Sequence, residues 1–148
     1  MLKGISSLIS PQLLECLAEM GHGDYIVIGD CNYPCASKSK RSLRADGVKA
    51  TDLLDAVLRL LPLDVDEPGE PVILMKSTDN PDYIPSVWND FERIVKKYEP
   101  KATFGKLDRF GFYNLSNEAY VSIQTSEEQY FGCVILRKGV WFTNEGKG

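Results

Sequence analysis

The sequence predicts a single α/β domain with three layers, α/β/α, built around a mixed central sheet. Segments with helical spacing alternate with short apolar runs through the first two thirds of the chain, and strand-like segments separated by short polar turns dominate the last third. The length of 148 residues suits one domain with a core of its own. No internal repeat is visible, so residues 1–148 are expected to form one unit.

Three segments carry apolar residues at helical spacing. The first begins at Pro11, with Ser10 as its N-cap. The second is expected to begin with Thr51 as its cap and to end before Pro62. The third is expected over residues 86–98. The apolar positions expected to face the sheet are Leu13, Leu14, Leu17 and Met20 in the first segment, Leu54, Val57, Leu58 and Leu61 in the second, and Trp88, Phe91, Ile94 and Val95 in the third.

The apolar runs 25–28 and 72–75 are typical of buried strands. Residues 30–43 are polar and are expected to be irregular, with a cationic tip. Residues 141–148 are expected to be loose, although their two aromatic side chains, Trp141 and Phe142, have the chemistry to dock on the domain. Further strands are expected over residues 109–113, 119–124 and 133–137.

The composition excludes several classes of protein. A net charge of −4 and an isoelectric point near 5.0 argue against a nucleic-acid surface. No apolar run approaches the roughly 20 residues of a membrane span, and the N-terminus lacks the apolar stretch of a signal peptide. A cytoplasmic protein is therefore expected, with Cys16, Cys31, Cys35 and Cys133 as reduced thiols. His22 with Cys31 and Cys35 lacks an evident fourth ligand, so no metal site is expected.

The single histidine, His22, is a candidate for proton transfer. It lies between glycines, after a predicted helix and before a predicted strand. Glycines leave the imidazole uncrowded, and imidazole both donates and accepts protons near neutral pH. The alternative is a histidine that ends the helix and bonds its last carbonyl groups.

Two further polar positions suit a sugar or another polar ligand. Asp30 follows the first predicted strand at its carboxyl end, where ligands of open α/β sheets gather; the alternative is an Asx turn. In the predicted strand 109–113, alternation puts Arg109 and Tyr113 on one face and the two phenylalanines on the other. A half-exposed strand explains the same pattern. Arg44 and Asp46 are expected to form an ion pair that orders their loop.

Several stretches, in this order along the chain, resemble the RbsD/FucU family of ribose pyranases and fucose mutarotases. The most specific is Met-Gly-His-Gly-Asp at residues 20–24, and the resemblance continues to about Val140. The stretches Arg-Ala-Asp-Gly at 44–47 and Arg-Phe-Gly-Phe-Tyr at 109–113 favour the fucose mutarotase branch. Residues 8–19, 52–56, 61–64 and 136–140 match as well.

The resemblance implies an isomerase of carbohydrate metabolism that interconverts the α and β anomers of L-fucose without a cofactor. It implies His22 as the proton donor and Asp30 and Arg109 as sugar-binding residues. It also implies a homo-oligomer, a ring-like pentamer or decamer. The charge and the lack of a long apolar run, given above, predict no nucleic-acid or membrane partner.

The chain departs from the family at one sugar-binding element. The family has a Tyr-Gly-Asn triplet just before the last strand, and this sequence has Phe131, Gly132 and Cys133 there. A phenol and an amide are therefore missing. The nearby phenols of Tyr113, Tyr120 and Tyr130 are the candidates to supply the hydroxyl.

Other functions remain open at this point. The Phe131 and Cys133 replacements favour a sugar-binding or sensing module without catalysis. A mutarotase or pyranase acting on ribose or another pyranose is a second alternative, and a structural or interaction protein is a third.

The spacing of His22 and Asp30 poses a geometric problem. They are eight positions apart, and a strand advances about 3.3 Å per residue, so they lie at opposite ends of the strand between them. Either residues 21–24 fold back over the sheet, or a neighbouring subunit completes the site.

Overall fold

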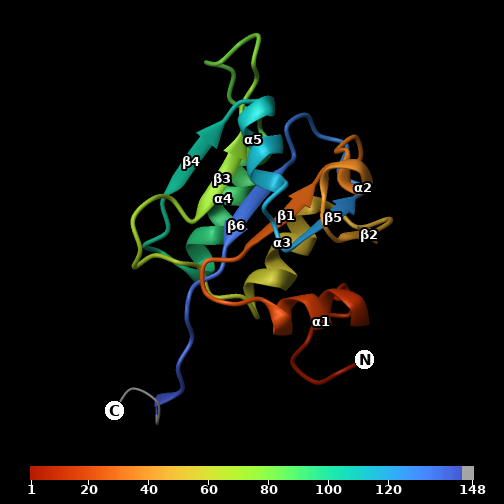
Figure 1. Ribbon diagram of the computed structural model, residues 1–148, viewed down its shortest axis with the longest axis vertical. Coiled ribbons are helices and arrows are strands. Elements are labelled where there is room, and N and C mark those ends of the chain that lie inside the picture. Colours follow the sequence, from red (N-terminus) through yellow and green to blue (C-terminus); the bar gives the residue numbers. More distant parts are fainter. Residues whose placement is uncertain (145–148) are drawn as a thin grey trace.

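The computed structural model describes residues 1–144, which form six strands and five helices in a three-layer arrangement (Figure 1). The single mixed sheet has the strand order β2-β5-β1-β6-β3-β4. In chain order the elements are α1 (Pro11–Glu19), β1 (Tyr25–Gly29), α2 (Cys35–Lys38), β2 (Ser42–Ala45), α3 (Ala50–Leu58), β3 (Val72–Met75), α4 (Val87–Tyr98), β4 (Phe104–Leu107), α5 (Arg109–Ser116), β5 (Val121–Thr125) and β6 (Val134–Arg137).

One strand runs against the rest of the sheet. β5 is parallel to β1 and β2, and β3 is parallel to β4, whereas β6 lies between β1 and β3 and is antiparallel to both. The carboxyl ends of β1 and β3 therefore lie at one edge of the sheet, and the carboxyl end of β6 lies at the opposite edge. The antiparallel direction of β6 decides which of the candidate site residues lie at the same edge of the sheet.

Each face of the sheet buries a separate apolar core, because successive side chains of a strand point to opposite faces. Ile26 and Ile28 of β1 pack with α1, α3 and α4, whereas Val27 packs with Phe112 of α5 on the other face. Figure 1 shows α5 in front of the sheet and α3 and α4 behind it. The predicted three-layer fold is confirmed.

Most of the predicted elements are confirmed. Ser10 caps α1, and its Oγ accepts a hydrogen bond from the Leu13 amide at 3.1 Å. The strands expected near 25–28, 72–75, 119–124 and 133–137 are present as β1, β3, β5 and β6. The helix expected over 86–98 is α4, and its four predicted apolar residues are buried.

The strand predicted over 109–113 is wrong: this segment is the first part of helix α5. The aromatic residues favour a strand by propensity, but Asp108 begins a helix by accepting a hydrogen bond from the Gly111 amide at 2.8 Å. Phe110 and Phe112 consequently separate, since Phe110 is 57% exposed and Phe112 is fully buried.

The structure differs from the prediction in three smaller respects. Thr51 lies inside the first turn of α3, whose N-cap is Lys49 without a side-chain cap. The stretch 30–43 is not wholly irregular, because it contains α2 and the start of β2. Strand β4, which precedes α5, was not anticipated.

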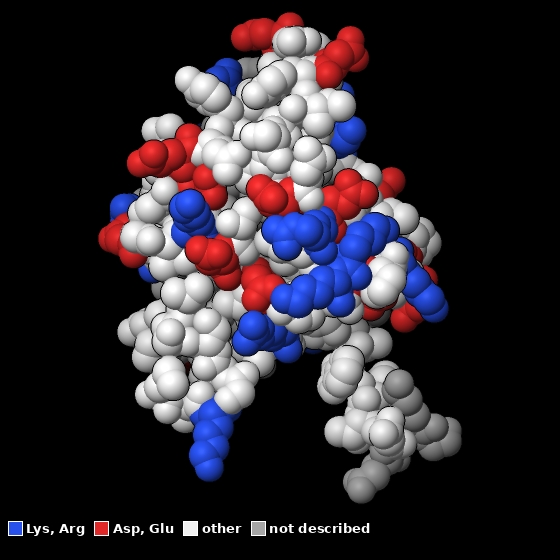
Figure 2. Space-filling model, turned by 180° about the vertical axis from the view of Figure 1, so that it is seen from behind, with Lys and Arg blue, Asp and Glu red and all other residues white. Residues whose placement is uncertain are grey.

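The outer faces of α3 and α4 carry intermixed charges of both signs (Figure 2). Asp55 of α3 lies 2.9 Å from Lys97 Nζ and 3.4 Å from Arg59 Nε, and it accepts a hydrogen bond from the Tyr98 hydroxyl. Within residues 1–144, no helix has the length and apolar character needed to cross a membrane. Trp141 and Phe142 do not pack into either core and are 79% and 58% exposed. The rest of the tail predicted to be loose, residues 145–148, lies outside the described part of the chain.

Candidate active site

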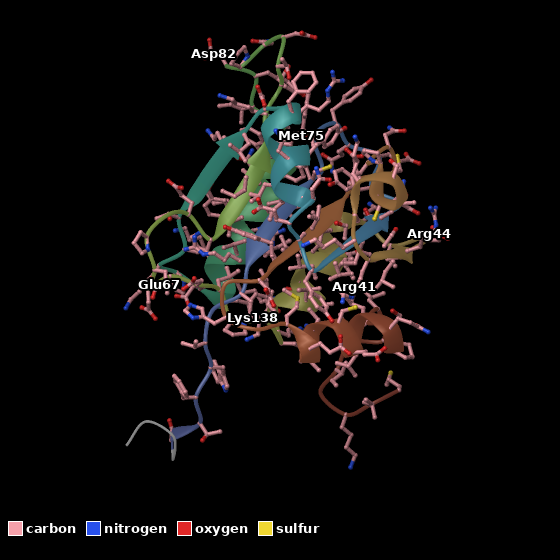
Figure 3. The ribbon with its side chains drawn as sticks, in the orientation of Figure 1. Arg41, Arg44, Glu67, Met75, Asp82 and Lys138 are labelled. Atoms are coloured by element: carbon pink, nitrogen blue, oxygen red, sulfur yellow. The ribbon has the colours of Figure 1, made fainter. Side chains whose placement is uncertain are left out.

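The predicted functional residues gather at two opposite edges of the sheet. Figure 3 shows the separation: Glu67 and Lys138 lie at the lower edge, and Met75 and Asp82 lie at the upper one. His22 belongs to the lower edge, before β1, and Asp30 belongs to the upper edge, after it. We refer to the two groups as the His22 corner and the Asp30 cluster.

The His22 corner is held by backbone hydrogen bonds to the segment after β6. The Gly23 amide donates to the Lys138 carbonyl at 2.8 Å, and the Lys138 amide donates to the Asp24 carbonyl at 2.8 Å. Gly23 has a φ of 86°, a left-handed conformation that favours glycine. Residues 21–24 are thus fixed at the lower edge and do not fold back over the sheet.

The imidazole of His22 faces a buried carboxylate. His22 Nε2 lies 3.3 Å from Asp64 Oδ2, and Arg137 Nε lies 3.0 Å from the same oxygen. Asp64 is 4% exposed, whereas the His22 side chain is 44% exposed. The Arg137 guanidinium also donates to the carbonyl groups of Asp64, Glu67 and Pro68. The carboxylate that orients His22 is therefore itself oriented by an arginine.

This arrangement suits proton transfer. With Nε2 facing Asp64, Nδ1 points away from the carboxylate; it accepts a proton when it is the unprotonated nitrogen of the neutral ring, and it donates one when the ring is protonated. The partly exposed imidazole is open to a ligand, while Asp64 restrains its orientation. Among the described residues, the amide that bonds the last turn of α1 is that of Met20, which donates to the Cys16 carbonyl, and His22 has no such bond. The helix-ending alternative for His22 is therefore not favoured.

The Asp30 cluster is built where β1 ends. The Asp30 amide donates to Cys133 Sγ at 3.4 Å, and Asp30 Oδ1 accepts from the Asn32 amide at 2.9 Å. The second bond is the Asx turn given above as the alternative for Asp30. It engages one carboxylate oxygen, so the turn and a role in ligand binding are compatible.

Burial perturbs the acid–base groups of the Asp30 cluster. Burial raises the pKa of Asp30, and the nearby Glu127 carboxylate adds to the rise. Burial likewise raises the pKa of Tyr113, with Cys133 and Asp30 also raising it and Arg109 lowering it. Burial raises the pKa of the Cys133 thiol well above its ordinary value. Perturbed groups gathered in one place are a common sign of a functional site.

The triplet 131–133 lies directly beside Asp30. Phe131 has a φ of 58°, a left-handed conformation that is uncommon for a bulky residue and that recurs at functional sites. A Cβ at Gly132 would lie 2.7 Å from Glu127 Cγ, so only glycine fits there. Cys133 is buried, and its sulfur lies beneath the Asp30 backbone rather than at the surface.

Arg109 and Tyr113 remain on one side of their element although that element is a helix. Positions i and i+4 of a helix share a face, as positions i and i+4 of a strand do. Arg109 is exposed at the start of α5, and Tyr113 is half-buried, with its ring 5.8 Å from the ring of Tyr33. Tyr113 is close enough to the Asp30 cluster for Cys133 and Asp30 to raise its pKa, whereas Tyr130 is 79% exposed. Tyr120 is engaged elsewhere, since its hydroxyl bonds Glu19.

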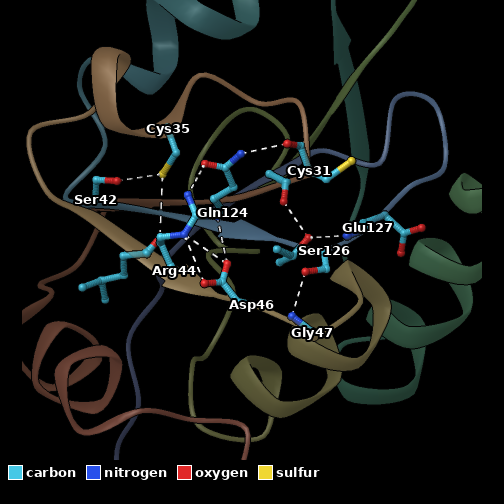
Figure 4. A network of polar contacts seen from close by, with 12 residues as sticks. Cys31, Cys35, Ser42, Arg44, Asp46, Gly47, Gln124, Ser126 and Glu127 are labelled. Carbon is cyan, nitrogen blue, oxygen red and sulfur yellow. Dashed lines mark hydrogen bonds and ion pairs between the residues drawn. The ribbon is translucent and has the colours of Figure 1, made fainter.

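A polar network braces the cluster from the side of β2 (Figure 4). The predicted ion pair is confirmed, with Arg44 Nη2 2.9 Å from Asp46 Oδ1. Arg44 also donates to Gln124 Oε1 at 3.2 Å, and Gln124 Nε2 donates to the Cys31 carbonyl at 2.9 Å. The chain just after Asp30 is thus tied to the Arg-Ala-Asp-Gly segment.

Sequence reasoning missed three residues at these two places. Asp64 and Arg137 complete the His22 corner, and the only signal for them was their presence in stretches that resemble the family. Glu127 was missed altogether. Its carboxyl is buried, Oε1 accepts from the Gln129 amide at 3.1 Å, and Oε2 has no hydrogen-bond partner among the described residues. The described residues contain no group of three or more His, Cys, Asp or Glu side chains arranged to hold a metal.

Comparison with known proteins identifies the family. The model of the RbsD / FucU transport protein family matches residues 3–141. Human fucose mutarotase is 40% identical over 148 residues, which cover 97% of this chain and 96% of that protein. The chain therefore belongs to the RbsD/FucU family.

Solved structures agree with this assignment. The fucose mutarotase of Streptococcus pneumoniae, solved in complex with L-fucose, is 39% identical, with a TM-score of 0.89 over 95% of this chain and 100% of that one. The RbsD of Bacillus subtilis, solved with D-ribose, is 18% identical with a TM-score of 0.69, and shares the fold. The fucose branch is thus the more similar of these two.

Proposed function

We propose that this protein is an isomerase that interconverts the α and β anomers of L-fucose. The observation that carries the proposal is identity of about 40% to fucose mutarotases along nearly the whole chain, together with the oriented imidazole of His22. The four cysteines are unpaired, which is compatible with a role in the reducing cytoplasm.

The reaction needs proton transfer at two oxygens and nothing more. The pyranose ring opens when the anomeric hydroxyl loses a proton and the ring oxygen gains one, and it recloses on the other face of the carbonyl. His22 donates or accepts one of these protons, and the contact with Asp64 holds the ring in place. Positioned proton transfer contributes about 10²–10⁴-fold. That is sufficient, because the uncatalysed reaction already proceeds in water.

The Asp30 cluster has the groups to bind the sugar. Asp30 keeps one carboxylate oxygen free of the Asx turn and accepts from sugar hydroxyls. Arg109 donates to them, and Tyr113 supplies the hydroxyl that Phe131 lacks. Gly132 and Cys133 are buried, so they act by positioning Asp30 and Phe131.

The two groups reach one sugar only if two subunits share the site. Within one chain they lie at opposite edges of the sheet, and residues 21–24 are held away from Asp30 by their bonds to Lys138. The chain leaves the His22 corner after Lys138, and three exposed apolar residues come next: Val140, Trp141 and Phe142. They are suited to burial against another copy of the chain. We infer a homo-oligomer, a ring in the manner of a pentamer or decamer, in which the His22 corner of one subunit meets the Asp30 cluster of the next.

Magnetisation-exchange NMR on L-fucose at anomeric equilibrium tests the proposed function. We expect the protein to speed exchange between the anomeric signals over buffer alone, and His22→Ala to abolish most of that gain. Saturable fucose binding without faster exchange would instead favour a binding module, which the Phe131 and Cys133 replacements allow. The same measurement on D-ribose and D-galactose decides the choice of sugar.

A further inference from the structure

A loop from a distant part of the chain reaches the Asp30 cluster. Residues 76–86 connect β3 to α4 and project beyond the upper edge of the sheet, as the positions of Met75 and Asp82 in Figure 3 show. We call this segment the 76–86 loop. Its base is fixed because the Lys76 amide donates to the Leu107 carbonyl at 2.8 Å, and Pro85 is buried.

The 76–86 loop has internal hydrogen bonds, and its last residue is tied to the segment before Phe131. The Asn80 amide donates to Ser77 Oγ at 3.1 Å, and the Tyr83 amide donates to the Asn80 carbonyl at 3.0 Å. At the end of the loop, Ser86 Oγ donates to Gln129 Oε1 at 3.0 Å. The loop is thus held beside the Asp30 cluster rather than free in solvent.

Tyr83 of this loop contacts Phe131. Their ring centroids are 6.1 Å apart and the ring planes meet at 61°, an edge-to-face arrangement. The backbone at Phe131 is left-handed, and the close packing at Gly132 restricts the backbone next to it. Both rings keep exposed surface, with Tyr83 42% exposed. The pair therefore presents an apolar surface next to Asp30.

We propose that Tyr83 and Phe131 together bind the C6 methyl group of the sugar and that Tyr83 is a specificity-determining residue. This inference rests on the proposed function. L-Fucose is a 6-deoxy sugar, and its methyl group is the part of the molecule that gains most from leaving water. The side chain of Phe131 is a hydrocarbon without a polar group, so this wall is suited to an apolar part of the sugar.

D-Arabinose is the informative comparison substrate, because it keeps the ring configuration of L-fucose and lacks the methyl group. One methyl group in an apolar pocket is worth on the order of 10–200-fold in specificity. We expect Tyr83→Ala to lower the preference for L-fucose over D-arabinose by about tenfold. The loss should fall on kcat/KM for L-fucose and leave D-arabinose nearly unchanged. Exchange NMR measures both sugars.

Two variants keep the test sharp. Tyr83→Phe retains the ring without the hydroxyl and should keep the preference. Ile84→Ala removes a neighbouring, 66% exposed apolar side chain from the same loop and should keep it as well. Thermal unfolding of each variant reports whether the loop change disturbs the fold.

Unchanged preference in Tyr83→Ala overturns the inference while leaving the proposed function intact, and so does an equal loss for both sugars. Tyr83→Phe behaving like Tyr83→Ala overturns it too, because the hydroxyl would then be the group in use. If the unaltered protein speeds neither sugar, the proposed function itself fails. Saturation-transfer NMR is a second test, because it reports which protons of the sugar lie against the protein. Absence of transfer to the fucose methyl group overturns the inference.

Discussion

Asp64 is the residue whose importance follows most directly from its contacts. It is buried between an exposed imidazole and a largely buried guanidinium, and within residues 1–144 no other carboxylate pairs with either group. The same side chain therefore serves two purposes. It restrains the imidazole of His22, the proposed proton-transfer group, and it neutralises Arg137 within the fold.

Asp64→Asn should therefore reduce both activity and stability. The amide cannot balance the Arg137 charge, and removal of one partner from a buried pair typically costs about 3–5 kcal/mol. We expect a lower urea midpoint and slower anomer exchange. His22→Ala is the matched control, because it should slow exchange with little effect on the midpoint, since its side chain is 44% exposed. An Asp64→Asn protein with normal exchange would contradict the role assigned to the pair.

Asp30 shows the opposite relation between function and stability. Burial raises its pKa, so the folded protein holds the Asp30 proton to higher pH than the unfolded chain does. Its charge therefore disfavours folding at neutral pH, and this penalty disappears as the pH falls below the ordinary carboxyl pKa of about 3.9.

Asp30→Asn should stabilise the protein at pH 7 while weakening sugar binding. Loss of hydrogen bonds to a charged acceptor predicts a fall in fucose affinity of about tenfold or more. Urea unfolding at neutral and acidic pH, with fucose titration at pH 7, checks both effects. The stability gain should vanish near pH 3.5, about where the unperturbed carboxyl is protonated in both states. A gain of equal size at both pH values would show that the charge is not its cause.

At the scale of elements, α5 shows what sequence patterning predicts and what it misses. The spacing of Arg109 and Tyr113 puts them on one side of the segment whether it is a helix or a strand. Their shared face was therefore predictable, but the type of element was not. The cap at Asp108 decides for the helix, and it lies just outside the aromatic run. The helices α1 and α4 were predictable because apolar residues recur at helical spacing in both, and in α1 the cap at Ser10 agrees with that spacing.

Asp108→Ala tests the contribution of this cap. Loss of an N-cap typically costs about 1 kcal/mol, and α5 covers a core that contains Phe112 at full burial. We expect a modestly lower urea midpoint. Fucose affinity should fall as well, because Arg109 lies in the first turn of α5 and depends on the cap for its position. Ser10→Ala removes the cap of α1, which carries none of the proposed sugar-binding residues, and should lower only the midpoint.

At the scale of the whole molecule, the direction of β6 decides the site. Because β6 runs antiparallel to β1, one end of β6 lies at the Asp30 cluster and the other at the His22 corner. The triplet 131–133 precedes β6 at the upper edge, and Arg137 ends it at the lower edge. The separation of His22 from Asp30 was predictable from strand length alone. The partners of His22 were not, because Asp64 and Arg137 come from segments that meet only through the pairing of β6 with its neighbours.

A mixing experiment tests the shared site. Homo-oligomers of His22→Ala lack a working His22 corner, and those of Asp30→Asn lack a working Asp30 cluster. If each site takes one group from each of two subunits, random mixing places two intact groups together in about one quarter of the sites. Exchange activity should rise well above that of either variant alone. The double variant His22→Ala/Asp30→Asn, treated in the same way, should stay inactive.

Native mass spectrometry must show mixed oligomers for this comparison to decide the matter. Mixed oligomers without recovered activity would place the whole reaction within one chain, and so would a monomer with full activity. Either result would require His22 to act without Asp30, because residues 21–24 are bonded to Lys138 at the far edge of the sheet. Recovery would make the neighbouring subunit part of the catalytic machinery, and dissociation of the oligomer should then abolish exchange while leaving each subunit folded.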